Sequence, residues 1–160
     1  MSVGLDKSVQ PAEGGIEKPV QPGGAVDGVP GPGLPDDVYT RLLTLRTRLR
    51  RFERWSADQA QAAGLTPMQH QLLLAIRGHT DPRGPTVGDV AEYLLLRHHS
   101  AGELIQRAEA AGLVNRVRDG SDQRVIRLGL TDAAARRLES LTALHLEEVK
   151  RLTAESPLGV

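Results

Sequence analysis

The spacing of apolar residues predicts a long helix between Asp36 and about Ala63. Apolar side chains recur there at alternating intervals of four and three residues, directly after Pro35. This heptad stripe fits an ordinary amphipathic helix, but its narrowness and length favour packing against another long helix, including one from a second copy of the chain. The stripe consists of Val38, Leu42, Leu45, Leu49 and Phe52.

Start and stop signals predict a second helix immediately afterwards. Gly64 ends the first helix, and Thr66, Pro67 and Gln69 have the spacing of a capping box with proline in the first turn. The helix is predicted to run to Gly78 and to be largely buried. Its apolar residues are Leu72, Leu73, Leu74 and Ile76.

Two shorter helices are predicted next, separated by a few residues. Thr86 caps the first, whose inward residues are expected to be Val90, Ala91, Leu94 and Leu95. The second runs from about Arg97 to Ala111 and ends at Gly112. Its inward face is Ala101, Leu104, Ile105 and Ala108, and its outward face is Arg97, His98, Ser100, Gln106 and Arg107.

The period then changes to two, which predicts a β-hairpin. Leu113 to Arg118 and Arg124 to Leu130 are the strands, joined by a turn over 119–122. Thr131 and Asp132 start a last long helix. Its apolar face is Ala134, Leu138, Leu141 and Leu144.

Composition changes the picture mainly at the ends. Residues 1–35 are rich in glycine and proline and lack apolar periodicity, so we expect a disordered tail, with a second flexible segment at 154–160. The formal net charge is 0, the tail carries −2, and the remainder therefore carries +2. The absence of cysteine excludes disulfides and thiolate zinc sites. Without a secretory or membrane-spanning segment, we expect a cytoplasmic protein with no membrane partner.

The order of elements predicts a winged helix-turn-helix: mainly α with a small β-hairpin, over residues 36–153. The second short helix is sized for the DNA major groove, and the hairpin, with Arg116, Arg118, Arg124 and Arg127, can follow the phosphate backbone or reach the minor groove. We expect long dimerisation helices at 36–63 and 131–153 and a DNA-binding lobe at 65–130.

Several segments resemble the MarR family of winged-helix transcription regulators. They are residues 65–74 (LTPMQHQLLL), residues 108–114 (AEAAGLV), and a wing of residues 119–124 (DGSDQR) followed by Leu-Gly-Leu-Thr at 128–131. The wing is similar to the family's Asp-x-x-Asp-Arg-Arg pattern but has Gln123 where the first arginine stands. The start of the recognition helix also departs from the family, because Arg97 occupies the place of a small capping residue.

The resemblance implies a homodimer that binds a pseudo-palindromic operator, with the recognition helix in the major groove and Arg124 in the minor groove. It also implies that Asp122 pairs with an arginine that steadies the wing. The expected recognition-helix residues are Arg97, His98, His99, Ser100, Ala101, Glu103, Gln106 and Arg107, and the expected wing residues are Arg116, Arg118, Asp122 and Arg124. The expected dimerisation residues are Val38, Leu42, Leu45, Leu49, Leu138, Leu141 and Leu152.

The partners expected are double-stranded DNA, a second copy of the chain and a small aromatic or phenolic effector, which relieves repression. Trp55 either covers the core or lines an effector pocket between the dimer helices and the lobe. No cofactor is expected. The alternatives are a winged-helix protein-interaction module and a metal-responsive regulator, although the five histidines lack a metal-binding spacing. No enzyme motif is present, so an enzyme is not expected.

Overall fold

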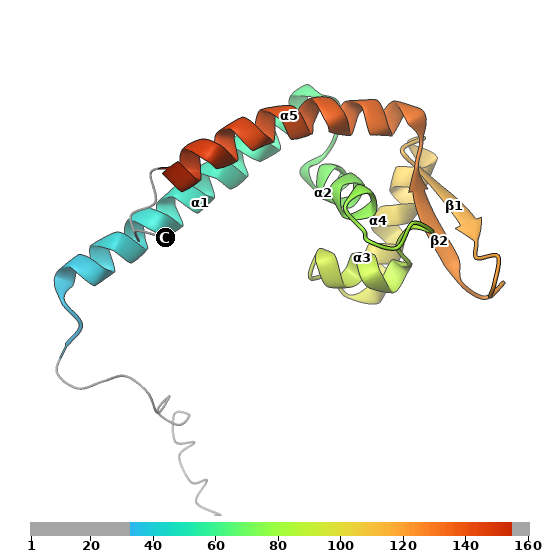
Figure 1. Ribbon diagram of the computed structural model, residues 1–160, viewed down its shortest axis with the longest axis horizontal. Coiled ribbons are helices and arrows are strands. Elements are labelled where there is room, and N and C mark those ends of the chain that lie inside the picture. The colour runs from blue at the N-terminus through green and yellow to red at the C-terminus, as the bar shows by residue number, and fades with distance from the viewer. Residues whose placement is uncertain (1–32, 155–160) are drawn as a thin grey trace, which may run out of the picture. The chain divides into compact units, whose positions relative to one another are not determined.

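The structure is a computed structural model that describes residues 33–154, all but the first of which lie in one compact unit. The predicted tail, except for its last three residues, and the predicted flexible C-terminus, except for Ala154, lie outside the described residues. Five helices and a hairpin follow the predicted order (Figure 1). They are α1 (Asp36–Ala62), α2 (Pro67–Arg77), α3 (Val87–Tyr93), α4 (His98–Ala110), β1 (Val114–Arg118), β2 (Ile126–Leu130) and α5 (Asp132–Ala154).

Two helices, α2 and α3, begin at capping boxes, and each box is formed by residues that are close together in the sequence. At the start of α2, the Gln69 N–H donates to Thr66 Oγ1 (3.2 Å) and the Thr66 N–H donates to Gln69 Oε1 (2.8 Å). At the start of α3, Thr86 and Asp89 make the same reciprocal pair, with the Thr86 N–H 2.7 Å from Asp89 Oδ2. Each box satisfies N–H groups that have no partner within the helix. These boundaries confirm the predicted starts.

The hydrophobic core lies between α2, α3, α4 and the base of the hairpin, and residues from the end of α1 and the first half of α5 complete it. The predicted inward face of α4 is confirmed, since Ala101, Ile105 and Ala108 are fully buried and Leu104 is 5% exposed. The largest fully buried side chains come from different elements, so the core holds the whole lobe together. They include Leu72, Leu73, Val90, Ile105, Val114 and Leu128.

Three leucines predicted to be buried are exposed. Leu95 is 92% exposed and has φ +52°, because it forms the turn between α3 and α4 rather than the end of α3. Leu74 and Leu144 are 45% and 50% exposed, since each lies on the edge of its helix's apolar face. The periodicity gave the right face in each helix but overestimated its width.

The hairpin is tied to the lobe through the loop between α2 and α3. β1 and β2 pair antiparallel, with Val114 opposite Leu130 and Arg118 opposite Ile126. The Leu128 N–H donates to the Pro85 carbonyl (2.9 Å), so the loop adds a strand-like bond to the free edge of β2. The chain approaches so closely there that a Cβ atom on Gly84, which has φ +87°, would lie 2.2 Å from the Leu128 carbonyl oxygen.

The long helices α1 and α5 lie side by side and run in opposite directions (Figure 1). They are joined by a hydrogen bond between Ser56 Oγ and His145 Nε2 (2.8 Å). Leu138 and Leu141, predicted to form a dimer surface, are each 3% exposed and belong to the chain's own core. That prediction is wrong for these two residues, because their side chains are already covered within one copy.

Candidate nucleic-acid interface

The outward face of α4 presents a row of polar side chains at and beyond the helix start. Arg97 is the N-cap residue and, with His98 and His99, it is exposed, whereas Ser100 is half-buried. One turn and more further along, Glu103, Gln106 and Arg107 are exposed, and the last pairs with Glu103 at 3.8 Å. Ala101 is fully buried, so its predicted place in a contact surface is wrong.

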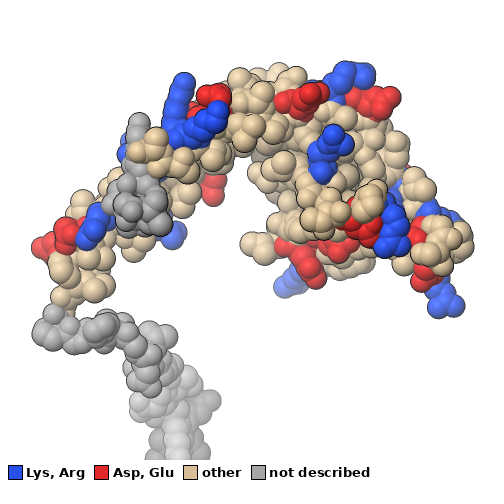
Figure 2. All heavy atoms as spheres, in the orientation of Figure 1, with Lys and Arg blue, Asp and Glu red and all other residues tan. Residues whose placement is uncertain are grey.

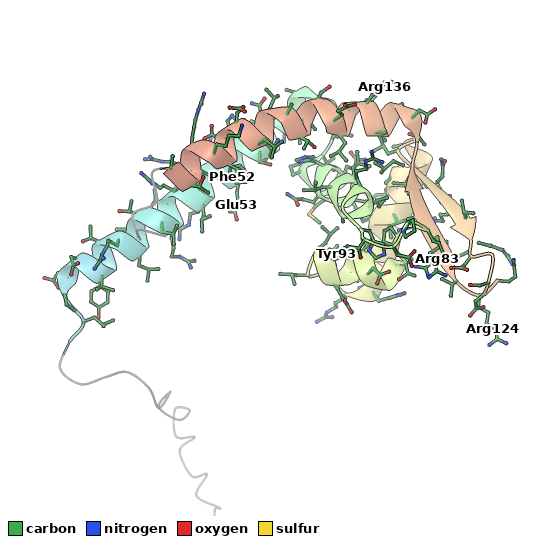
Figure 3. The ribbon with its side chains drawn as sticks, in the orientation of Figure 1. Phe52, Glu53, Arg83, Tyr93, Arg124 and Arg136 are labelled. Atoms are coloured by element: carbon green, nitrogen blue, oxygen red, sulfur yellow. The ribbon has the colours of Figure 1, made fainter. Side chains whose placement is uncertain are left out.

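The hairpin turn carries exposed arginines at its outer end. Figure 3 shows Arg124 at the tip, pointing away from the lobe, and Arg118 at the end of β1 is also exposed. Basic side chains project there in the space-filling view, with acidic ones beside them (Figure 2). Arg116 is drawn back toward the lobe by an ion pair with Glu109 of α4 (2.9 Å).

Arg127, which sequence analysis counted among the wing's DNA-facing arginines, instead turns inward. Its side chain is 15% exposed, and its Nε donates to Asp119 Oδ2 (2.9 Å) while one terminal nitrogen donates to the Gly84 carbonyl (3.1 Å). Arg83 of the α2–α3 loop donates to the same Asp119 oxygen (3.2 Å) and to Asp81 (2.7 Å). Two arginines and two aspartates therefore join the wing to the lobe.

Asp119 is the residue that holds the wing turn in shape. Its side chain is 2% exposed, and Oδ1 accepts from the Ser121 N–H (2.8 Å) and hydroxyl (2.6 Å). The resemblance implied that Asp122 pairs with an arginine, but in the structure Asp119 has this role. Asp122 forms no salt bridge within residues 33–154, and it accepts a hydrogen bond from the Arg124 N–H (2.9 Å). Hydrogen bonds from Ser121 and Arg127 hold the pKa of Asp119 well below its usual range.

A neighbouring carboxyl is shifted in the same direction. Hydrogen bonds from Arg83 lower the pKa of Asp81 to about 2. Both carboxylates are therefore charged throughout the neutral range, and protonation weakens their contacts only in acid. The network was missed by sequence analysis, because its members lie up to 46 positions apart along the chain (Asp81 to Arg127) and only the fold brings them together.

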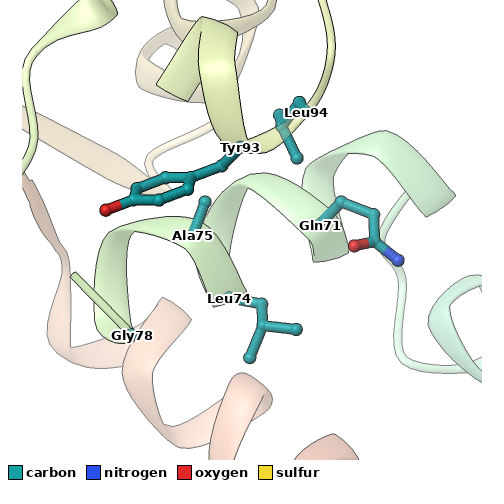
Figure 4. Close-up of a pocket in the computed structure, with 6 residues that line it drawn as sticks. All are labelled: Gln71, Leu74, Ala75, Gly78, Tyr93 and Leu94. Atoms are coloured by element: carbon teal, nitrogen blue, oxygen red, sulfur yellow. The ribbon is translucent and has the colours of Figure 1, made fainter. Parts of the chain in front are cut away.

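A groove of about 560 Å³ lies at the junction of α2 and α5. Apolar groups dominate its wall, and two arginines, Arg77 and Arg136, also line it; neither forms an ion pair within residues 33–154. A smaller hollow of about 250 Å³ lies between α2 and α3, with the Tyr93 ring beside Ala75 (Figure 4). The Tyr93 hydroxyl is 2.8 Å from His79 Nδ1.

Trp55 lines neither of these hollows. It borders a third groove, between α1 and α5, and its ring centroid lies 4.9 Å from that of His145. Trp55 was expected either to cover the core or to line a pocket between the long helices and the lobe. The groove that it lines lies instead between α1 and α5.

Two histidines meet where α2 packs against α5. The ring centroids of His70 and His145 are 4.7 Å apart, and burial together with the charge of His145 lowers the pKa of His70. His145 Nδ1 lies 2.8 Å from the Leu141 carbonyl. His79 lies just beyond α2. No three metal-ligating side chains converge within residues 33–154.

Residues 63–125, which span α2 to the wing turn, match the model of the MarR family. Over these residues the chain is similar to the MarR family. The match covers three of the segments that resembled this family, up to the wing turn, and it ends before residues 128–131. No match to a curated protein sequence was found.

Solved structures resemble both the lobe and the long helices α1 and α5. AbsC, a MarR family transcriptional regulator from Streptomyces coelicolor, is 22% identical with a TM-score of 0.63, over 76% of this chain and 82% of AbsC. MepR from S. aureus in complex with DNA is 20% identical with a TM-score of 0.61, over 70% of this chain and 79% of MepR. MarR from E. coli is 19% identical with a TM-score of 0.58, over 69% of this chain and 81% of MarR. At these identities the likeness shows the fold, which is the predicted winged helix.

None of the helices within residues 33–154 is both long enough and apolar enough to cross a membrane.

Proposed function

We propose that this chain is a sequence-specific DNA-binding transcription regulator. The observation that carries the proposal is the combination of two exposed features on one lobe: the polar face of α4 and the arginine-bearing wing tip. A helix of this size enters the major groove, which is about 12 Å wide. Arginines at a wing tip neutralise phosphates or enter a narrow minor groove. The DNA-bound structure of MepR, which has the same fold, supports this assignment.

We infer the roles of the individual side chains from their positions. Arg97, His98 and His99 lie at the start of α4, where base edges are met first. Ser100 and Glu103 border this surface, and Gln106 and Arg107 lie further along it, where phosphates are closer. On the wing, Arg118 and Arg124 are the arginines best placed for DNA, with Arg116 and Asp122 in supporting positions.

Selection of bound duplexes from a random pool, followed by fluorescence anisotropy, tests the proposal. We expect an enriched half-site in two copies, and an affinity that falls steeply as salt increases, because bound cations are released from phosphates. Arg124→Ala should weaken binding and reduce the salt slope by about 0.9 for each phosphate that the variant no longer neutralises. Arg54→Ala, which removes an exposed arginine from α1, outside α4 and the wing, is the matched control.

An absence of preference over random duplex would refute sequence-specific recognition. Equal losses for Arg124→Ala and Arg54→Ala would refute the wing contact. The alternative role of such a domain is to bind a protein partner through the hairpin. In that case, the affinity of the chain for DNA should change little with salt.

We also infer that the regulator is a homodimer formed through α1 and α5, which together we call the arm. The two helices pair around Ser56 and His145 in antiparallel fashion, so the first turns of α1 extend beyond the end of α5. The extension carries exposed apolar side chains, and α5 exposes others. They are Tyr39, Leu42, Leu43 and Leu49 on α1, and Leu144, Leu146 and Val149 on α5. Such exposure on one arm is typical of an interface.

We keep three further expected dimerisation residues in the proposed dimer seam, which are half-buried in one copy of the chain: Val38, Leu45 and Leu152. Leu42→Asp should shift the mass measured by light scattering toward that of one chain, since a charge would enter an apolar interface. Leu95→Asp, at an exposed leucine outside the arm, should leave the mass unchanged. A single-chain mass for the unmodified protein would overturn the dimer.

We further propose that the groove between α2 and α5 holds a small aromatic or phenolic effector that relieves repression of a promoter. Its volume suits a small molecule, and its wall combines aliphatic groups with Arg77 and Arg136. A ligand there would bind at the junction of arm and lobe and alter the separation of the two recognition helices. By thermodynamic reciprocity, operator DNA would weaken the ligand by the same factor.

Calorimetry with salicylate as the probe, in the presence and absence of operator, tests this coupling. We expect Arg77→Gln to weaken the ligand, and equal affinity with and without DNA would refute the coupling.

A further inference from the structure

A cationic groove with aromatic side chains in its wall lies between α1 and α5. Its volume is about 370 Å³, and it shares no lining residue with the groove between α2 and α5. α1 contributes Arg48, Arg51, Phe52 and Trp55, and α5 contributes Glu148, Arg151 and Leu152. We call it the arm groove.

Aromatic residues are concentrated in the arm groove. The whole chain has one Trp, one Phe and two Tyr, and the first two of these residues line this hollow together. The rings of Phe52 and Trp55 are stacked, with centroids 6.0 Å apart and planes at 29°. Both side chains are half-buried, so they border the groove while anchoring in the arm. A flat ring entering the groove would meet aromatic surface.

Arginine side chains line the arm groove from both helices. Three arginines face one carboxylate, and that carboxylate, Glu148, is engaged by Arg151 at 3.4 Å. Arg51 forms no ion pair or hydrogen bond with another side chain within residues 33–154. A guanidinium beside an aromatic ring binds carboxylate or phosphate in a planar fork and stacks on π systems.

The groove lies on a different side of α1 from the proposed dimer seam. Arg48, Arg51 and Trp55 are spaced by three and four residues and share one side of the helix. At 3.6 residues per turn, the stripe of Leu42, Leu45 and Leu49 is centred about a third of a turn away. Leu152 borders both the groove and the proposed seam, but Arg51 and Trp55 lie outside the stripe, so a ligand and a partner copy contact largely different side chains.

We propose that the arm groove binds a planar aromatic anion, with its ring against Phe52 and Trp55 and its carboxylate or phosphate on the guanidinium group of Arg51, beside Arg48. The volume accommodates a one- or two-ring compound. The ring supplies stacking and apolar burial, and the charge supplies orientation. This site is independent of the proposed DNA contacts and of the effector groove.

Calorimetry on the full chain, with 1-naphthoate and 1-naphthyl phosphate as probes, tests the proposal. Binding of either probe at one per chain is expected, and the tighter of the two identifies the anionic group. 1-Naphthalenemethanol, which has the ring without the charge, and cyclohexanecarboxylate, which has the charge without a planar ring, should each bind at least about tenfold more weakly.

The site is located by NMR, because Trp55 is the only tryptophan and gives a single indole N–H signal. That signal should shift on titration with the naphthyl anion. Arg51→Gln should weaken binding by about tenfold or more, since it removes a charged hydrogen-bond donor. Arg50→Gln, at the exposed neighbouring arginine that does not line the groove, should change affinity less than about twofold.

Four results would overturn the proposal: no binding of either anion, equal binding of the neutral alcohol, equal effects of Arg51→Gln and Arg50→Gln, or loss of binding in Arg77→Gln alone. The last would assign the ligand to the groove between α2 and α5. Both arginines at positions 50 and 51 are exposed, so neither substitution disturbs the core, and circular dichroism checks that the fold is retained.

Discussion

Replacing Gly84 with alanine should be among the most damaging small changes in this protein. The residue has φ +87°, where a side chain costs about 1–2 kcal/mol. The added Cβ would also lie 2.2 Å from the Leu128 carbonyl oxygen, a backbone atom that cannot rotate away. Relief requires separating the loop from β2, which removes the hydrogen bond from Leu128 to Pro85 and the one from Arg127 to Gly84.

The expected loss is the sum of these effects. Two hydrogen bonds contribute about 0.5–1.5 kcal/mol each, and the one from the charged Arg127 is at the upper end. With the backbone strain, Gly84→Ala should lower the free energy of unfolding by about 3–5 kcal/mol. Gly64→Ala is the matched control, because Gly64 has φ +72° but nothing within 4 Å of its Cβ position. It should cost about 1 kcal/mol, the strain alone.

Urea unfolding followed by circular dichroism measures both values. Protein concentration must be the same in each experiment, since the stability of the proposed dimer would depend on it. Gly120→Ala, which has neither a positive φ nor a close neighbour, should fall within about 0.5 kcal/mol of the unmodified chain. If Gly84→Ala were no worse than Gly64→Ala, the close approach of loop and strand would be refuted.

Three further predictions concern a histidine, a carboxylate and a strained leucine. The pKa of His70 is lowered by burial, so the unfolded chain binds a proton more readily than the folded chain, and stability should fall as pH drops below about 6.5. In His70→Gln, the urea concentration at the unfolding midpoint should depend less on pH between about pH 7.5 and 5.5. An unchanged pH dependence would contradict this. Asp119→Ala should speed tryptic cleavage of the wing by about tenfold at neutral pH, because the turn loses hydrogen bonds to charged groups. Asp122→Ala should have a smaller effect. The stabilisation that Asp119 gives to the turn is present above the ordinary pKa of an aspartate and is lost only in acid. Leu95→Gly should raise the free energy of unfolding by about 1 kcal/mol, because glycine adopts φ +52° without strain and removal of a 92% exposed side chain costs no packing. A loss of stability would contradict this and would show that the turn depends on a contact of the Leu95 side chain.

Features set by neighbouring residues were predictable from the sequence. The capping boxes at Thr66 and Thr86 and the glycine after α4 place helix ends within a residue or two, since each uses hydrogen bonds or φ values local to the chain. The buried face of α4 followed from its 3.6-residue period. The winged-helix order followed in turn from these elements.

Features set by contacts between distant segments were not predictable. The inward turn of Arg127 depends on Asp119 and on the carbonyl of Gly84, and periodicity alone makes an arginine on a two-stranded hairpin look exposed. Leu138 and Leu141 show the converse. Their spacing fits a dimer seam, but the core of the same chain covers them first.

The bond from Leu128 to Pro85 and the Asp119 cluster join the wing to the lobe, so we expect the two to move together. In the proposed dimer, an event in the arm would then change how far apart the two lobes stand without changing the angle between α4 and the wing within either lobe. Regulation acting through the arm would therefore scale the affinity for every operator of a given half-site spacing by a common factor. The ranking of base sequences within the half-site would stay the same with and without the signal.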